Sequence, residues 1–189
     1  MDDKIKVGLI GEFPTDVNCI KSLLIKKYPD IHWFPLIQDV HGSMLENQHI
    51  KHTLRKQYEV SKPQVVIFIR DLDSNEEDEI MMKKRLDYLR EFNRVVNGRG
   101  HLLLNIQELE AILLTDVSIL NKKYGSNLEK IEDCMSIKSP KDYIRERIGK
   151  YTTGDNEELF AKYDFGYVVT NCRYFKKFIE EVHPKFMRN

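Results

Sequence analysis

The feature that most constrains the fold is a short, uninterrupted hydrophobic segment in the first half of the chain. Val65 to Ile69 are five consecutive apolar residues, preceded by Gln64 and followed by Arg70. A strand with one solvated face alternates apolar and polar side chains, whereas a strand buried on both faces does not. Residues 64–70 are therefore predicted to form a central strand of a parallel sheet covered by helices on both faces.

The segments around this strand alternate between strand-like and helix-like patterns. Pro35 favours an edge position for the strand that contains it. Ser74 and Glu77 have the spacing of a capping box for a helix that ends near Val96. Strands are expected at residues 4–10, 31–37 and 101–104, and helices at 15–28, 45–58, 74–96, after Asn105 as far as Leu120, and at 171–182.

This order predicts an α/β fold with a mainly parallel sheet flanked by helices. Residues 1–124 are expected to form the α/β core. The helical signal after Gly125 is weaker, and residues 125–189 are expected to form a helical C-terminal extension packed on the core as part of one compact unit.

The composition limits the classes of function. The chain has 189 residues, with 30 Lys and Arg balanced by 30 Asp and Glu. Zero net charge excludes a generally basic coat protein for nucleic acid, so an anionic partner requires a local patch or a metal ion. Three dispersed cysteines, no long apolar segment and no signal-peptide pattern predict a cytoplasmic protein with reduced thiols and no membrane span.

Acidic residues follow two of the predicted strands. Glu12 comes after the first strand, and Asp71 and Asp73 come after the most hydrophobic one. Sites in open parallel sheets form beyond the carboxyl ends of the strands. In extended backbone, residues i and i+2 point the same way and lie about 6.5–7 Å apart, so the two aspartates are expected to face one point. Glu12 joins them if the two strands are neighbours.

Three clustered carboxylates repel one another unless they are protonated or neutralised by a cation. Ligands of this kind suit Mg²⁺ or Mn²⁺, which can activate water and stabilise a leaving oxygen at a phosphodiester. The alternative interpretation is structural, because acids at strand ends often cap the next helix or lie in solvent.

Three segments carry a resemblance to a known superfamily. Ile10–Asp16 and Val65–Asp73 resemble the glutamate and Asp-x-Asp motifs of TOPRIM domains, which occur in primases, topoisomerases and nucleases. Ile106–Asp116 resembles a helix of a small bacterial TOPRIM-like family, domain of unknown function 4276. Together with Ser139–Tyr143 and Cys172–Phe178, the likeness extends over most of the chain.

The resemblance implies roles for individual residues. Glu12 would be a metal ligand or a general acid/base, and Asp71 and Asp73 would be metal ligands. Glu108 or Glu110 is a candidate for a further ligand. Because helical residues i and i+2 diverge by about 200°, at most one of these two is expected to reach the metal. The alternative for Glu108 is a structural role, in which it forms a capping box with Asn105 at the start of the helix.

TOPRIM domains usually place glycine after the glutamate, where this chain has Phe13. Phenylalanine is costly at a positive φ. Either the turn differs, with Gly11 as the flexible residue, or the site is degraded.

A basic segment follows later in the chain. Lys138, Lys141 and Arg145 have the spacing of a helical stripe that could contact phosphates, although a solvated surface is the alternative. No P-loop motif is present, so ATP would have to be bound by a partner.

The leading hypothesis is a Mg²⁺- or Mn²⁺-dependent nuclease, with DNA favoured over RNA. The resemblance further implies a bacterial or archaeal cytosolic protein, encoded beside a P-loop ATPase partner and active in defence against phage or plasmids. Self-association into a homo-oligomer is a separate candidate interaction. The rivals are a non-catalytic subunit that docks an ATPase, which Phe13 favours, and a phosphotransferase with Asp71 as the phosphoryl acceptor.

Overall fold

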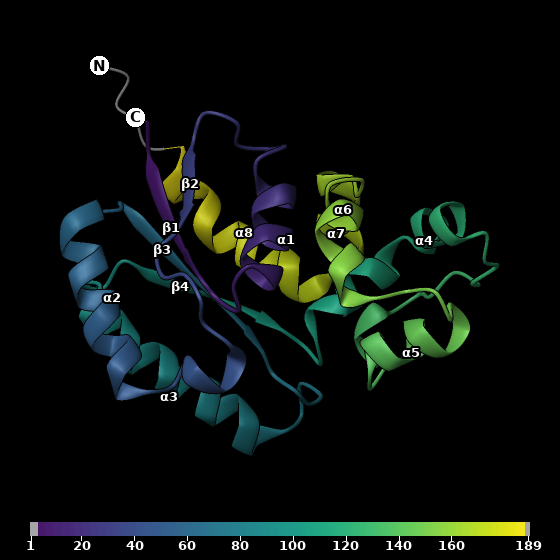
Figure 1. The fold of residues 1–189 in the computed structure, drawn as a ribbon, viewed down its shortest axis with the longest axis horizontal. Helices are drawn as coiled ribbons and strands as arrows, with labels where there is room; N and C mark the ends of the chain where they lie inside the picture. The colour runs from purple at the N-terminus through teal and green to yellow at the C-terminus, as the bar shows by residue number, and fades with distance from the viewer. Residues whose placement is uncertain (1–3, 188–189) are drawn as a thin grey trace.

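The computed structural model describes residues 4–187 and is built around a four-stranded parallel sheet. The strand order is β2-β1-β3-β4, with β2 and β4 at the edges (Figure 1). The α/β fold with a parallel sheet flanked by helices is thus confirmed, and the strand that contains Pro35 is at an edge, as expected. The strands are β1 (Lys6–Ile10), β2 (His32–Pro35), β3 (Val65–Asp71) and β4 (Gly100–Asn105).

Helices cover both faces of the sheet. α1 (Thr15–Leu24) and α8 (Arg173–Phe186) pack on the face that carries Leu9 and Ile67. α2 (Gln48–Ser61) and α3 (Glu79–Val95) pack on the other face. Successive strand residues point to opposite faces, so β3 contributes to both hydrophobic cores. This double burial explains why its sequence shows no polar alternation.

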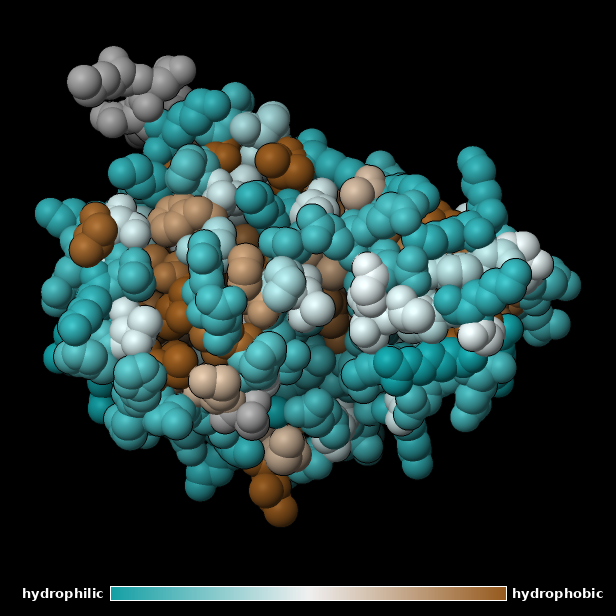
Figure 2. Space-filling view, viewed as in Figure 1, coloured by the Kyte–Doolittle hydropathy of each residue, from teal (hydrophilic) through white to brown (hydrophobic). Residues whose placement is uncertain are grey.

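Between β4 and α8 the chain forms a series of short helices. Figure 1 shows α4 and α5 at the end of the molecule away from the sheet. Among residues 4–187, no helix is both long and apolar enough to cross a membrane. On the face drawn in Figure 2, hydrophilic side chains predominate, and hydrophobic ones gather in the half that contains the sheet. The short elements are η1 (Gly42–Met44), η2 (Leu109–Thr115), α4 (Val117–Tyr124), η3 (Cys134–Ser136), α5 (Pro140–Arg147), η4 (Thr153–Asp155), α6 (Asn156–Phe160) and α7 (Phe165–Asn171).

Two predicted helix starts were wrong. The single helix predicted after Asn105 is instead the 3-10 segment η2 followed by α4, because Asp116 interrupts the helix and caps α4 through the Ser118 amide. The predicted capping box of Ser74 does not begin α3 either. Asp78 is the N-cap, accepting a hydrogen bond from the Met81 amide, and the Ser74 hydroxyl donates to the same carboxylate.

Two helix ends also differ from the prediction. α1 ends at Leu24, four residues earlier than expected. α8 continues past Pro184 to Phe186, because burial of Val182 and Phe186 in the core keeps the last turn helical.

The order of the strands places a crevice between β1 and β3. The chain leaves β1 for β2 on one side and then returns to β3 on the other side of β1. Loops that leave adjacent strands in opposite directions open a gap beyond the strand ends, which is where open α/β sheets bind ligands. The acids that follow β1 and β3 lie at this point.

Candidate functional site

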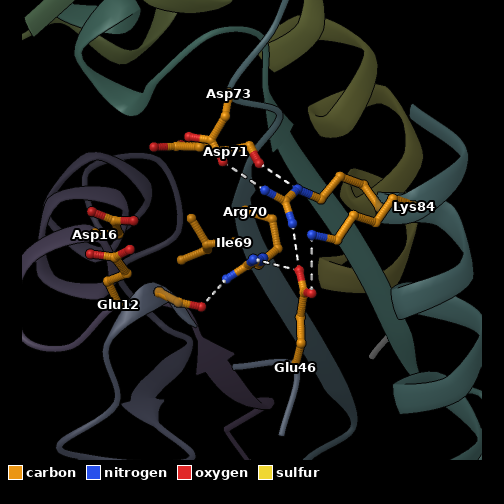
Figure 3. A pocket seen from close by; sticks show the side chains of 10 residues that line it. Glu12, Asp16, Glu46, Ile69, Arg70, Asp71, Asp73 and Lys84 are labelled. Carbon is orange, nitrogen blue, oxygen red and sulfur yellow. Dashed lines mark hydrogen bonds and ion pairs between the residues drawn. The ribbon is translucent and has the colours of Figure 1, made fainter. Parts of the chain in front are cut away.

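A pocket of about 380 Å³ lies at the carboxyl ends of β1 and β3. Its two sides carry opposite charge. In Figure 3, Glu12 and Asp16 lie side by side, across the pocket from Lys84 and Glu46. The lining residues are Glu12, Asp16, Gly42, Glu46, Ile69, Arg70, Asp71, Asp73, Lys84 and Arg85. The sequence prediction that Glu12 lies near the two aspartates agrees with this arrangement.

The acidic side of the pocket is formed by Glu12, Asp16 and Asp71. Glu12 is exposed on the loop after β1, Asp16 is half-buried in the first turn of α1, and Asp71 ends β3. Asp71 accepts a hydrogen bond of 2.9 Å from the Asn105 side chain at the end of β4. No Lys, Arg or His side chain within residues 4–187 forms an ion pair with these three acids.

Unbalanced negative charge changes the acidity of this cluster. Burial raises the pKa of Asp71 to about 7, and the charges of Glu110 and Asp73 add to this effect. Burial also raises the pKa of Asp16 well above its usual range, as do the nearby charges of Asp71 and Glu12. A cation bound among these carboxylates would replace the protons that they otherwise retain.

Sequence reasoning missed Asp16. Its place in the first turn of α1 suggested only a favourable interaction with the helix dipole. In the structure the Asp16 carboxylate lines the pocket, and the nearby charge of Glu12 contributes to its raised pKa. The available signal was topological, because the first turn of a helix that follows a strand lies at the carboxyl end of the sheet.

Asp73 reaches the pocket by a different backbone path from the one expected. β3 ends at Asp71, and Asp73 has a φ of 58°, in the left-handed region. The expected extended geometry is therefore wrong. Leu72, between the two aspartates, is fully buried. The carboxylate of Asp73 is held 2.6 Å from an Arg85 nitrogen, so it faces the basic side of the pocket.

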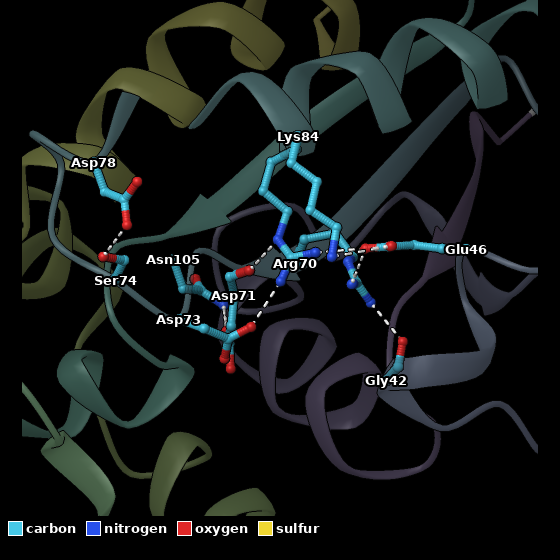
Figure 4. A network of polar contacts seen from close by, with 10 residues as sticks. Gly42, Glu46, Arg70, Asp71, Asp73, Ser74, Asp78, Lys84 and Asn105 are labelled. Carbon is cyan, nitrogen blue, oxygen red and sulfur yellow. Dashed lines mark hydrogen bonds and ion pairs between the residues drawn. The ribbon is translucent and has the colours of Figure 1, made fainter. Parts of the chain in front are cut away.

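The basic side of the pocket consists of Arg70, Lys84 and Arg85. Arg85 donates to the Asp71 carbonyl at 2.7 Å, which anchors the end of β3 to α3 (Figure 4). Arg70 donates to the Gly42 carbonyl at 3.1 Å and lies over the ring of Tyr88. These contacts hold two guanidinium groups at the pocket, each less than 8% exposed.

The turn after β1 does not require glycine in place of Phe13. The φ of Phe13 is not positive, and its ring packs against the hydrophobic core. Gly11 is not the flexible residue either, since its φ is also not positive. A Cβ at Gly11 would lie 3.0 Å from the Cβ of Ile69, so glycine is needed for close approach to β3.

The two later glutamates contact different partners, but the helical spacing argument does not apply to them, because Glu108 is the extended N-cap residue of η2. Glu110 is 5% exposed, accepts a hydrogen bond from Asn156, and raises the pKa of Asp71 by its charge. Glu108 instead accepts hydrogen bonds from the backbone amide and side chain of Lys141. The proposed capping box of Glu108 with Asn105 is therefore wrong, because the Asn105 side chain binds Asp71.

The predicted basic stripe does not form as a helical face. α5 begins at Pro140, so Lys138 precedes the helix. Lys141 is half-buried and forms an ion pair with Glu108, so of these three residues only Arg145 is an exposed residue of α5. Helical spacing thus fails as an argument for phosphate contact by these three residues.

The donor set of the acidic side fits a hard divalent cation in its chemistry. It consists of carboxylates that lack a cationic partner among residues 4–187, and burial raises the pKa values of two of them, Asp16 and Asp71. As they stand, however, no three acidic, histidine or cysteine side chains in the described part of the chain are close enough together to hold a metal. Glu12 is the exposed member of the set.

Comparison with known proteins found no matching family model, no matching curated protein and no matching solved structure. The site must therefore be interpreted from its own geometry.

Proposed function

We propose that this protein is a Mg²⁺- or Mn²⁺-dependent phosphodiesterase that hydrolyses nucleic acid. The observation that supports this proposal is the charge separation within one pocket. Carboxylates without a cationic partner line one side, and Arg70, Lys84 and Arg85 line the other. Phosphodiester cleavage requires both elements, since a metal needs acidic ligands and the phosphate needs positive charge.

Each residue has a role in this proposal. Asp71, Asp16 and Glu12 would hold the cation, and Asp73 and Glu110 would add negative charge nearby. The bound ion would supply Lewis acidity and a water of lowered pKa. Glu12 is exposed and is suited to accept the proton of the attacking water. Arg70 and Arg85, which are buried, would orient the phosphate and offset its negative charge.

The biological setting is part of the same proposal. The TOPRIM resemblance supports a cytoplasmic bacterial or archaeal nuclease that prefers DNA to RNA. It also supports a P-loop ATPase partner and a role in defence against phage or plasmids. A neutral chain with no P-loop motif of its own agrees with this division of labour.

The test is cleavage of labelled DNA and RNA in Mg²⁺ or Mn²⁺, with EDTA as the metal-free control. Asp71→Asn and Glu12→Gln are expected to lose cleavage, and Asp16→Asn is expected to reduce it. Asp30→Asn, an exposed acid outside the pocket, is the matched control. Equal cleavage by all of these proteins would identify a contaminant and remove the assignment.

A second candidate function is a non-catalytic docking subunit, and one observation favours it. A groove of about 370 Å³ lies along the edge strand β4, between α3 and α8, with an apolar lining that includes Leu86, Leu102 and Leu104. In the parallel ladder, residues 101, 103 and 105 face β3, so the backbone groups of Leu102 and Leu104 point outward. An exposed edge of this kind can pair with an extended segment of a partner.

Metal binding distinguishes the two candidates. The phosphodiesterase is expected to bind Mn²⁺ with one-to-one or two-to-one stoichiometry by calorimetry, and to lose that binding in Asp71→Asn. A docking subunit would show no such binding. It would instead lose its partner when Leu86, which is 41% exposed, is changed to glutamate.

A further inference from the structure

Three cationic side chains in the pocket converge on one carboxylate. Glu46 lies 3.0 Å from an Arg70 nitrogen, 2.5 Å from an Arg85 nitrogen and 3.4 Å from Lys84 Nζ. Figures 3 and 4 show Arg70 and Lys84 gathered around the Glu46 side chain, which enters the pocket from the segment before α2. A single carboxylate in contact with three positive groups is a concentrated anion-binding arrangement.

The two arginine side chains are buried in the pocket wall, and their hydrogen-bond donors are not all paired there. Arg70 and Arg85 are 7% and 4% exposed, and burial of a guanidinium is costly unless its donors are paired. The Nε of Arg70 is buried and has no hydrogen-bond partner within residues 4–187. Three cations also face only two carboxylates here, those of Glu46 and Asp73. The basic side therefore has spare donors and spare positive charge.

Glu46 is held less firmly than the cations that surround it. Its side chain is 32% exposed, whereas Leu45 before it is fully buried. Asn47 after it caps α2 through the His49 amide. Because the backbone is anchored on both sides, rotation of the Glu46 side chain alone would open the site.

We propose that Arg70, Lys84 and Arg85 form a binding site for a phosphate group, and that the Glu46 carboxylate occupies this site when no ligand is bound. Guanidinium groups bind carboxylate and phosphate oxygens in the same paired geometry. A phosphate has more oxygens and more charge than a carboxylate, so it can also engage donors that Glu46 leaves unpaired. Binding of phosphate thus displaces Glu46 toward solvent.

This inference deepens the proposed function, because it names the residues that would hold the phosphate of the substrate in the same pocket. It does not depend on hydrolysis, since the basic side of the pocket is complete without a metal ion. The phosphate could belong to a nucleic acid strand or to a free phosphate, and the two sources call for separate measurements.

The experiment measures binding of inorganic phosphate and of a short single-stranded DNA by calorimetry, in EDTA and at fixed ionic strength. Glu46→Gln is expected to tighten phosphate binding roughly tenfold, because the internal competitor loses its charge. Lys84→Gln is expected to weaken binding roughly twofold to fivefold, since this side chain is about half exposed. Lys83→Gln, an exposed neighbour outside the pocket, is the matched control and is expected to bind like wild type.

Unchanged phosphate affinity in Glu46→Gln, or equal effects of the Lys83 and Lys84 substitutions, would overturn the inference. Competition between phosphate and DNA supports the site with nucleic acid as its ligand. Phosphate binding without DNA binding supports the site with free phosphate as its ligand and contradicts the nuclease. Failure of hydrolysis alone, with the Glu46 effect intact, would remove only the proposed function.

Discussion

Replacement of Asp71 by asparagine is expected to stabilise the metal-free protein, even though it is expected to abolish activity. Asp71 is a half-buried carboxylate at the end of β3 with no cationic side chain paired to it among residues 4–187. Asparagine has nearly the same shape and keeps an oxygen that can accept the hydrogen bond from Asn105. The substitution therefore removes the buried charge and preserves the main contact.

The size of the effect follows from the pKa of Asp71. Burial raises that pKa from its ordinary value of 3.8 to about 7. Between these values the folded state retains a proton that the unfolded state has lost, so the free energy of unfolding falls as pH rises through this window. At about 1.4 kcal/mol per pKa unit, the full shift corresponds to an upper limit of about 4 kcal/mol.

The assay is urea denaturation of both proteins in EDTA at pH 4.5 and pH 8. The advantage of Asp71→Asn should grow from about 1 kcal/mol at the lower pH to as much as about 4 kcal/mol at the higher pH. Asp30→Asn, an exposed aspartate, should show no pH-dependent gain. If Asp71→Asn brings no gain, or the same gain at both pH values, then Asp71 does not carry an unfavourable buried charge.

Three further substitutions test other parts of the site. Arg85→Met should lower the free energy of unfolding by about 2–4 kcal/mol in urea, because it removes a buried cation that contacts three partners; a loss below about 1 kcal/mol would contradict a structural role. In Gly42→Ala the new Cβ would lie 2.1 Å from Glu12 Oε1, so the Glu12 side chain must turn. The affinity for Mn²⁺ should therefore change, whereas the free energy of unfolding should shift by less than about 0.5 kcal/mol. Glu110→Gln should lower the pKa of Asp71 in an NMR titration, because the charge of Glu110 helps to raise it; an unchanged pKa would place Glu110 outside the cluster.

The local sequence contains enough information for the sheet and for part of the site. The uninterrupted hydrophobic run of β3 reflects burial on two faces, which is a property of the strand itself. The carboxyl ends of parallel strands share one edge of the sheet, so the presence of Glu12 and Asp71 in one pocket follows from topology alone. These predictions depended on patterns within a few residues or on general rules of parallel sheets.

Other predictions failed because they depended on partners far away in the chain. Asn105 was expected to cap a helix, but the adjacent strand offers it the carboxylate of Asp71. Lys141 was expected to share a helical face with Lys138, but it pairs with the carboxylate of Glu108, 33 positions away. The sequence pattern could not show these competing contacts, since each one depends on how separate elements pack.

The basic half of the pocket was decided entirely by tertiary structure. Arg70 follows the hydrophobic run of β3, Arg85 lies in a helix rich in charged residues, and Glu46 belongs to a polar segment with no motif. Packing of α3 against the sheet brings the three together and buries both arginines. The sequence by itself determined the parallel sheet and the acids at its edge, because those follow from local hydrophobicity and strand direction. Only the folded chain determined which cations face these acids. The ion pairs of Glu46 with Arg70 and Arg85 join residues that are separated by 24 and 39 positions, and such distant pairs leave no periodic signal in the sequence.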